Sequence, residues 1–141
     1  MTAVREMTEE ADETVFDQTE SRAFRKLVAL VVDDSSAQRK MLKMLLRKWN
    51  FEVVEASDGR SALEAVQTQN IDFVISDWMM PEMSGPKLCR EVRALDQEHY
   101  VYFILLTSKT SKEEVTAGLD AGADDFLTKP MDMGELHARL R

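Results

Sequence analysis

Five residues with chemically active side chains lie where short apolar runs of this sequence end. They are Asp33, Asp34, Asp77, Thr107 and Lys129. The apolar runs that precede them are rich in Val, Ile, Leu and Phe, which is typical of strands buried on both faces. Because parallel strands bring their carboxyl ends to one edge of a sheet, we expect these side chains to lie together there.

Three carboxylates at one edge would repel one another, and one or more would hold a proton unless a cation neutralised them. Mg²⁺ suits this role because it takes oxygen ligands, including a few carboxylates, and keeps waters or phosphate oxygens as its other ligands. The ammonium of Lys129 would add a point charge for a phosphate, and the hydroxyl of Thr107 would add a hydrogen-bond donor. Asp77 would then be a carboxylate nucleophile beside Mg²⁺, able to form an aspartyl phosphate.

Each of these residues also has a simpler interpretation when it is taken alone. Asp33 and Asp34 could cap the helix that follows them. Asp77 could be a turn residue, and Thr107 and Lys129 carry almost no information by themselves. Their position at successive strand ends is what favours a shared site.

Apolar runs alternate with amphipathic helical patterns along the chain. The expected strands are residues 27–32, 51–56, 72–76, 101–106 and 125–127, and the expected helices begin near residues 35, 59, 86, 112 and 132. Five strand–helix units in series predict a parallel sheet with helices on both faces, joined by right-handed crossovers. The sequence therefore predicts a doubly wound α/β fold.

Individual positions carry more specific expectations. Ser35 or Ser36 should cap the first helix of this fold, and Asn50 should end it, because Asn tolerates the left-handed conformation. Met41 and Met44 are expected to fill the core, and Leu119 is expected to face inward from the fourth helix.

The composition limits the classes to which the chain can belong. Its 141 residues suggest one domain, and no apolar run approaches the roughly 20 residues of a membrane helix. The formal net charge of −8 argues against non-specific nucleic-acid binding, and the single Cys89 excludes an internal disulfide. Residues 1–25 are acidic and lack a signal-peptide core, so we expect a cytoplasmic protein with a solvated or partly helical arm; a docking or dimerising helix is the alternative for this arm.

From about Lys26 to Arg141 the sequence resembles the receiver domain of two-component response regulators. The matching pieces, in the order and spacing of that family, are "VVDDS", "ISDWMMPEMSG", "ILLTS" and "GLDAGADDFLTKP". The resemblance implies a CheY-like, flavodoxin-like fold whose five parallel strands follow the order 2-1-3-4-5. It divides the chain into the arm, residues 1–25, and a receiver domain, residues 26–141, whose last helix is short.

The resemblance also implies how the phosphoryl group is received. Asp77 would accept it from a sensor histidine kinase or a histidine phosphotransfer protein that docks near the first helix. Asp34, Asp77 and the backbone carbonyl of Met79 would bind Mg²⁺, with Asp33 acting through a coordinated water. The chain would catalyse only its own phosphorylation and dephosphorylation, and is therefore not expected to be an enzyme.

In such receivers the remaining site residues respond to the phosphoryl group. Thr107 and Lys129 would each bond one of its oxygens, and Phe126 would be the aromatic switch residue that turns inward when Thr107 moves. Met79 and Lys109 occupy positions that tune the access of water to the acyl phosphate. Because both side chains are long, we expect the phosphorylated state to last longer than in fast, chemotaxis-type receivers.

The sequence is compatible with several ways in which this receiver domain could pass on its signal. A homodimer could form through the fourth helix, the fifth strand and the last helix, where Asp125 and Arg139 could pair. The chain could be a stand-alone receiver, or a piece of a longer regulator with a nucleotide-cyclase, phosphatase or DNA-binding output.

Two other classes of protein fit the sequence poorly. A Mg²⁺-dependent aspartyl phosphatase needs a second acid two residues after its nucleophile, where this chain has Met79. A nucleotide-binding α/β domain needs a glycine-rich loop after the first strand, and "VVDDSSAQ" contains no glycine.

Overall fold

The computed structural model describes residues 26–108, 112–129 and 132–140 of the chain. Strands and helices alternate along these residues, as the sequence predicted. In chain order they are β1 (Val28–Val32), α2 (Ser36–Lys48), β2 (Glu52–Ala56), α3 (Gly59–Thr68), β3 (Phe73–Asp77), α4 (Gly85–Arg93), β4 (Tyr102–Thr107), α5 (Lys112–Asp120), β5 (Asp125–Thr128) and α6 (Met133–Arg139). None of the helices among these residues is long and apolar enough to cross a membrane.

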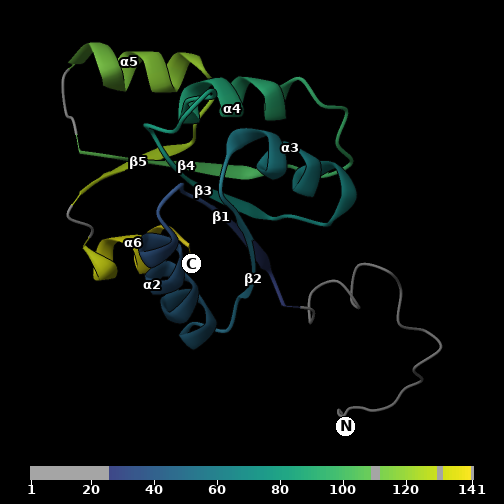
Figure 1. Ribbon diagram of the computed structural model, residues 1–141, viewed down its shortest axis with the longest axis vertical. Coiled ribbons are helices and arrows are strands. Elements are labelled where there is room, and N and C mark those ends of the chain that lie inside the picture. The colour runs from purple at the N-terminus through teal and green to yellow at the C-terminus, as the bar shows by residue number, and fades with distance from the viewer. Residues whose placement is uncertain (1–25, 109–111, 130–131, 141) are drawn as a thin grey trace, which may run out of the picture.

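The strands form one parallel sheet in the order β2-β1-β3-β4-β5, which confirms the predicted topology (Figure 1). The chain winds from β1 to one edge through β2, and then returns to build the other half from β3 onward. The direction of winding therefore reverses between β1 and β3. In sheets of this kind, sites lie beyond the carboxyl ends of the strands at that reversal.

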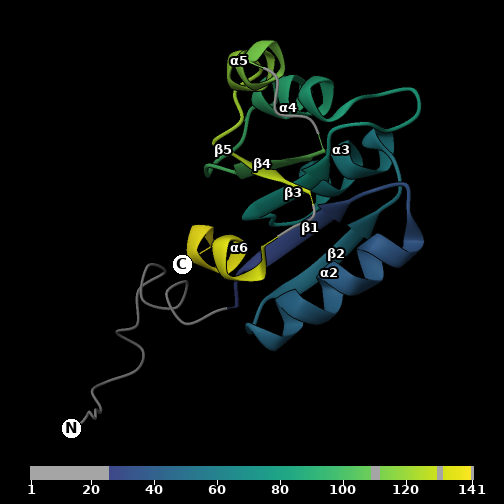
Figure 2. The same cartoon turned by 90° about the vertical axis from the view of Figure 1, so that its left-hand side faces the viewer.

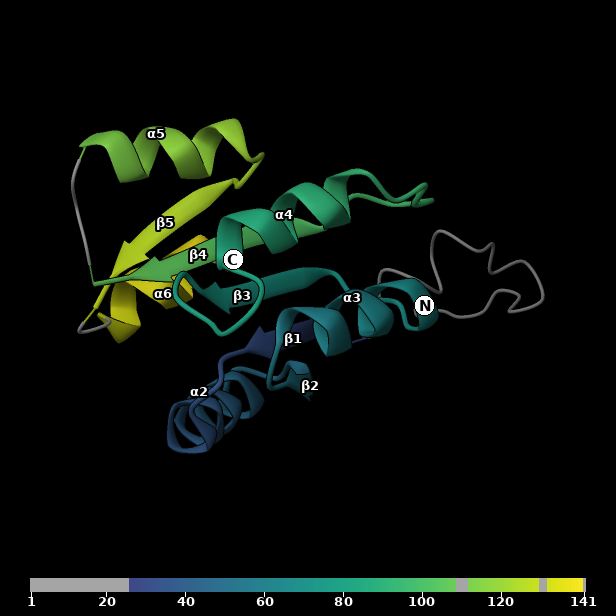
Figure 3. The ribbon, with the colours of Figure 1, turned by 45° about the horizontal axis from the view of Figure 1, so that its top comes forward.

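Helices cover both faces of the sheet. Figures 1 and 3 show α3, α4 and α5 on one face, and α2 and α6 on the other. Successive side chains of a strand point to opposite faces, so both must be apolar when both faces are covered. In β1, Leu30 packs on the side of α3 and α4, whereas Ala29 and Val31 pack on the side of α2 and α6.

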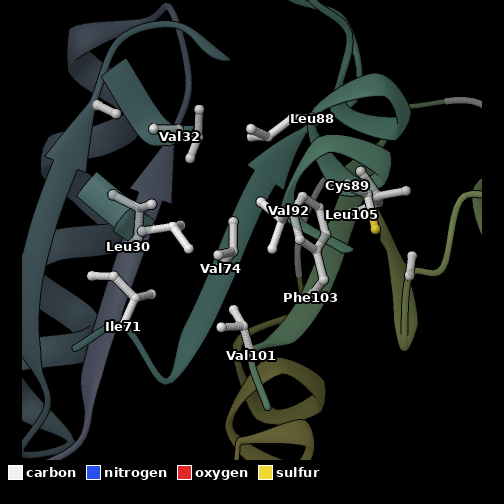
Figure 4. Close-up of a cluster of buried hydrophobic side chains, with 14 of the residues drawn as sticks. Leu30, Val32, Ile71, Val74, Leu88, Cys89, Val92, Val101, Phe103 and Leu105 are labelled. Carbon is white, nitrogen blue, oxygen red and sulfur yellow. The ribbon is translucent and has the colours of Figure 1, made fainter. Parts of the chain in front are cut away.

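The two cores are made of different strand residues. On the α3–α4 side, Leu30, Val74 and Phe103 of three neighbouring strands meet Leu88 and Val92 of α4 (Figure 4). The other core joins alternate strand residues to the buried side chains of α2 and α6. Its members are Ala29, Val31, Leu42, Leu46, Phe51, Ile75, Ile104, Leu106, Leu127, Leu136 and Leu140.

The ends of α2 match the sequence prediction. The Ser35 hydroxyl caps the helix by accepting a hydrogen bond from the Gln38 backbone N–H at 3.2 Å. Asn50 follows the helix with a φ of 71°, in the left-handed region that Asn tolerates. Since Ser35 is the cap, the simpler interpretation of Asp33 and Asp34 as helix caps is wrong.

Three side chains expected in the core lie on the surface. Met41 and Met44 of α2 are 39% and 68% exposed, and Leu119 of α5 is 54% exposed. The side of α5 that faces the sheet carries Gly118, where an added Cβ would lie 2.4 Å from Cε1 of Phe126. The helix approaches the sheet so closely there that a glycine, rather than Leu119, occupies the contact. Cys89, by contrast, is fully buried in the α4 core, and burial raises the pKa of its thiol to about 11.

Candidate functional site

Three carboxylates meet where β1 and β3 end. Asp33 follows the last residue of β1, and Asp77 is the last residue of β3, the parallel neighbour of β1. One carboxylate oxygen from each of Asp33, Asp34 and Asp77 lies within 4.8 Å of the other two. The prediction that these acids gather at one edge of the sheet is therefore confirmed.

Asp33 is the most buried of the three acids. It is 2% exposed, and its Oδ1 accepts a hydrogen bond from the backbone N–H of Ser35 at 2.9 Å. Its Oδ2 is buried without a hydrogen-bond partner among the described residues. Burial raises the pKa of this carboxyl, the Ser35 N–H opposes the rise, and the neighbouring Asp77 carboxylate adds to it. A buried acceptor with no donor is costly in a folded protein, unless a further group binds it.

The Asp77 carboxylate is held through one of its two oxygens. Oδ1 accepts from Nζ of Lys129 at 2.9 Å and from the backbone N–H of Trp78 at 2.9 Å. No described residue donates a hydrogen bond to Oδ2. The carboxylate is thus fixed in orientation while its second oxygen remains open to a ligand.

The backbone around Asp77 is fixed by the start of α4. The Gly85 N–H donates to the Trp78 carbonyl at 2.9 Å, and the Ser76 hydroxyl donates to the Asp77 carbonyl at 2.9 Å. A Cβ at position 85 would lie 2.5 Å from the same Asp77 carbonyl oxygen, so only glycine permits this approach. The helix that follows the site is in this way packed against the strand end that carries the acid.

Thr107 and Lys129 reach the same edge from the next two strands. Asp77 pairs in register with Leu106 of β4, so Thr107 lies one residue beyond it, and it is 4% exposed. Lys129 follows β5, and its backbone N–H donates to the Thr107 carbonyl at 2.8 Å. All five residues singled out in the sequence therefore share one end of the sheet.

The other predicted site residues lie around this cluster. Met79, two residues after Asp77, is 62% exposed. Phe126 of β5 is half-buried, and its ring stacks on Trp78 with the centroids 6.4 Å apart. Lys109, the second position expected to tune water access, lies outside the described residues.

Two contacts of the site have no signal in the sequence. The Trp78 ring meets Phe126, 48 positions later in the chain, and Nη1 of Arg39 donates to the Asp33 carbonyl at 2.6 Å. In the sequence, Arg39 cannot be distinguished from other charged residues on an exposed helix face. Only the turn from β1 into α2 brings its side chain to the Asp33 carbonyl. No motif or spacing could have identified either contact.

The donor set fits a hard divalent cation. Carboxylate oxygens that converge within 4.8 Å, together with the unpartnered Oδ2 of Asp33, are what Mg²⁺ needs from a protein. No nitrogen or sulfur ligand from the described part of the chain takes part, which distinguishes this cluster from a zinc or copper site.

Comparison with known proteins agrees with the fold and the cluster. The response regulator receiver domain family matches residues 29–141. The chain belongs to this family. Response regulator MprA of Mycolicibacterium vanbaalenii is 42% identical over 112 residues, which cover 79% of this chain and 48% of MprA. The chain thus spans about half the length of this relative.

Two solved structures have the same fold. The chemotaxis protein CheY4 of Vibrio cholerae is 35% identical, with a TM-score of 0.78 over 82% of this chain and 97% of CheY4. The receiver domain of the sensor histidine kinase PA1611 of Pseudomonas aeruginosa is 28% identical, with a TM-score of 0.75 over 82% of this chain and 95% of its own. That domain holds a magnesium ion coordinated in its active-site cleft.

Proposed function

We propose that this chain is a phosphorylation-controlled signalling switch in which Asp77 accepts a phosphoryl group from a histidine kinase or a histidine phosphotransfer protein. The proposal rests on the hydrogen bonds and the neighbouring acids of the Asp77 carboxylate. One oxygen is held by Lys129 and the Trp78 N–H, and two further acids lie within 4.8 Å. The proposed switch occupies residues 26–141, with residues 1–25 as a separate arm, in the cytoplasm.

The residues of the chain can perform the transfer as follows. Oδ2 of Asp77 attacks phosphorus, and the bond from phosphorus to the donor's histidine nitrogen breaks, leaving its electron pair on that nitrogen. The Lys129 ammonium, now on Oδ1, can pair with a phosphoryl oxygen, and the Thr107 hydroxyl can donate to another. The proposed Mg²⁺ ligands are Asp34, Asp77 and the Met79 carbonyl, with Asp33 acting through water, and the ion would neutralise the carboxylates and the phosphoryl oxygens.

The proposed response is a shift between two conformations. A phosphoryl group that draws Thr107 toward Asp77 changes the space available to Phe126, and thereby the surface that β5 and α5 present. Receiver domains are generally not true enzymes. The reactions we propose here are accordingly the phosphorylation of Asp77 and its reversal.

The proposed output runs through the face of α5, β5 and α6. Within the chain, the Nε atom of Arg139 lies 2.6 Å from Oδ2 of Asp125 on this face. The two relatives differ in what accompanies the receiver, because MprA extends far beyond the matched part whereas CheY4 is almost entirely matched. Either a homodimer or an additional output domain would be regulated through the same surface.

The proposal is tested by the mass of the intact protein after incubation with Mg²⁺ and acetyl phosphate. We expect the gain of one phosphoryl group, its absence in EDTA, and its absence in Asp77→Asn. The matched control is Asp96→Asn, an exposed acid between α4 and β4, which should be phosphorylated normally. No gain in the wild-type protein, with no change in tryptophan fluorescence on adding beryllofluoride, would refute the proposed function.

A further inference from the structure

Helix α2 carries a basic face in an acidic protein. Its 13 residues include five basic side chains and no acidic one, while the whole chain has a formal net charge of −8. The basic residues are Arg39, Lys40, Lys43, Arg47 and Lys48. Arg39 and Lys43 both bind Glu55 of β2, at 3.3 and 3.1 Å. Lys40 and Arg47 are exposed and form no ion pair with a described residue.

Four of the five basic side chains line a groove of about 340 Å³ along the helix. Its lining comprises Ser36, Arg39, Lys40, Lys43, Met44, Arg47 and Glu55. Met44, 68% exposed, supplies an apolar surface between the cations. A groove that combines exposed cations with one large apolar side chain is suited to an acidic peptide that also carries an apolar residue.

The N-terminal part of the chain contains such a peptide. Residues 7–20, "MTEEADETVFDQTE", include six acids and no basic residue, together with the apolar pair Val15 and Phe16. They lie outside the described residues and are joined to β1 through residues 21–27. The last turn of α2 and the start of β1 lie at the same end of the sheet (Figure 2), and the Glu52 N–H, just after α2, donates to the Leu27 carbonyl at 2.9 Å.

The segment is also long enough to follow the groove. A 13-residue helix is about 20 Å long, and fourteen extended residues span up to about 50 Å. Because the segment is tethered close to the groove, its effective concentration there is on the order of millimolar. Contacts that are individually weak at a protein surface can then be occupied without a high intrinsic affinity.

We propose that residues 7–20 of this chain bind the basic groove of α2. The acids meet Lys40 and Arg47, and Val15 and Phe16 contact Met44. Ser36, at one end of the groove, lies two residues after Asp34, so the bound segment covers the surface beside the carboxylate site. A protein that approaches this surface has to displace the segment. The contact itself does not depend on phosphorylation of Asp77, so this proposal and the proposed function can fail separately.

The test uses a spin label on the full-length chain. Cys89 is fully buried, so a cysteine introduced by Thr14→Cys can be labelled selectively. In low salt we expect the label to broaden the amide signals of α2 in the ¹⁵N spectrum, and to spare those of α4 and α5. The broadening should disappear in the double variant Lys40→Ala/Arg47→Ala, and in about 1 M NaCl, where the Debye length is about 3 Å. The matched control Arg60→Ala/Lys87→Ala removes two exposed cations of α3 and α4. The broadening of the α2 signals should be unchanged in this control.

Three results would overturn the proposal. The first is an absence of selective broadening on α2, and the second is broadening that survives both high salt and the double variant. The third is broadening of a ¹⁵N-labelled chain by the spin label on a separate, unlabelled chain, which would place the segment of a second copy in the groove.

Discussion

The ring of Phe126 stacks on the ring of Trp78, with centroids 6.4 Å apart and an interplanar angle of 27°. The backbone N–H of Trp78 donates at the same time to Oδ1 of Asp77. One residue therefore contacts both the proposed phosphoacceptor and the proposed switch residue. Movement of the Phe126 ring therefore has to change its contact with the Trp78 ring. The backbone of Trp78 is itself held by the Asp77 carboxylate.

The space for Phe126 in this position depends on Gly118, since a Cβ there would lie 2.4 Å from Cε1 and 2.7 Å from Cζ of the ring. We expect Gly118→Ala to displace the ring from Trp78. Overpacking of this kind lowers the free energy of unfolding by about 1–3 kcal/mol. The better helix propensity of Ala offsets about 1 kcal/mol of this loss. Urea unfolding and Trp78 fluorescence, measured with Trp49 replaced by Phe, report the two effects.

Gly134→Ala is the matched control for this variant. Gly134 lies on the exposed side of α6, and its added Cβ would come no closer than 3.3 Å to Oδ1 of Asp132. This variant should be as stable as the wild-type protein or slightly more so, with unchanged fluorescence. Equal behaviour of the two variants would show that Gly118 does not set the position of Phe126.

Replacing Lys129 should impair phosphorylation. Lys129→Met removes the ammonium 2.9 Å from Oδ1 of Asp77 and leaves three carboxylates without their neighbouring cation. Loss of one such charged donor at a reacting centre costs about 10²–10³-fold in rate. We expect a reduction of this order in the rate of phosphorylation by acetyl phosphate, measured by intact mass. Lys87→Met, which removes an exposed cation from α4, should react at the wild-type rate.

The buried carboxyl of Asp33 should lower the stability of the metal-free protein at neutral pH. Its pKa is raised in the folded state, so as pH increases the unfolded chain releases this proton before the folded chain does. The free energy of unfolding therefore falls as pH rises from about 4, the ordinary value of an aspartic acid, through the raised pKa. We expect Asp33→Asn to unfold at higher denaturant concentration than wild type at pH 7 in EDTA.

This difference has a defined pH dependence. It should shrink as pH is lowered and vanish below about pH 4, where both states of the wild-type protein hold the proton. Mg²⁺ should also reduce it, because a cation offsets the repulsion among the acids that the substitution removes. A variant that is less stable than wild type at pH 7 in EDTA would contradict the prediction.

The exposed side chain of Met79 should protect the phosphorylated state. It lies two residues after Asp77 and is 62% exposed, at a position where a long apolar chain can obstruct the approach of water. We expect Met79→Asn to lose phosphate faster than the wild-type protein, and we expect Lys109→Glu to do the same. The decay is followed by intact mass after removal of the phosphodonor. The control is Met41→Asn, a change on the surface of α2. If Met79→Asn loses phosphate no faster than this control, the proposed role of Met79 is refuted.

Local patterns in the sequence determined most of the architecture and the location of the site. Continuous apolar runs predicted strands covered on both faces, and their alternation with helical patterns predicted the parallel sheet. The gathering of Asp33, Asp34 and Asp77 followed from their positions at the ends of those strands. The Ser35 cap and the left-handed Asn50 were also predictable, because each depends on the chemistry of a few adjacent residues.

The tertiary structure alone decided which side chains touch. Helical spacing suggested an inward Leu119, but the close approach of α5 to Phe126 requires Gly118 at the contact and turns Leu119 outward. The sharing of one Asp77 oxygen by Lys129 and the Trp78 N–H joins residues 52 positions apart. Such contacts depend on how helices and strands pack across the sheet. The pattern of strand ends predicts that Lys129 and Asp77 share one edge, but it does not specify which of their atoms meet.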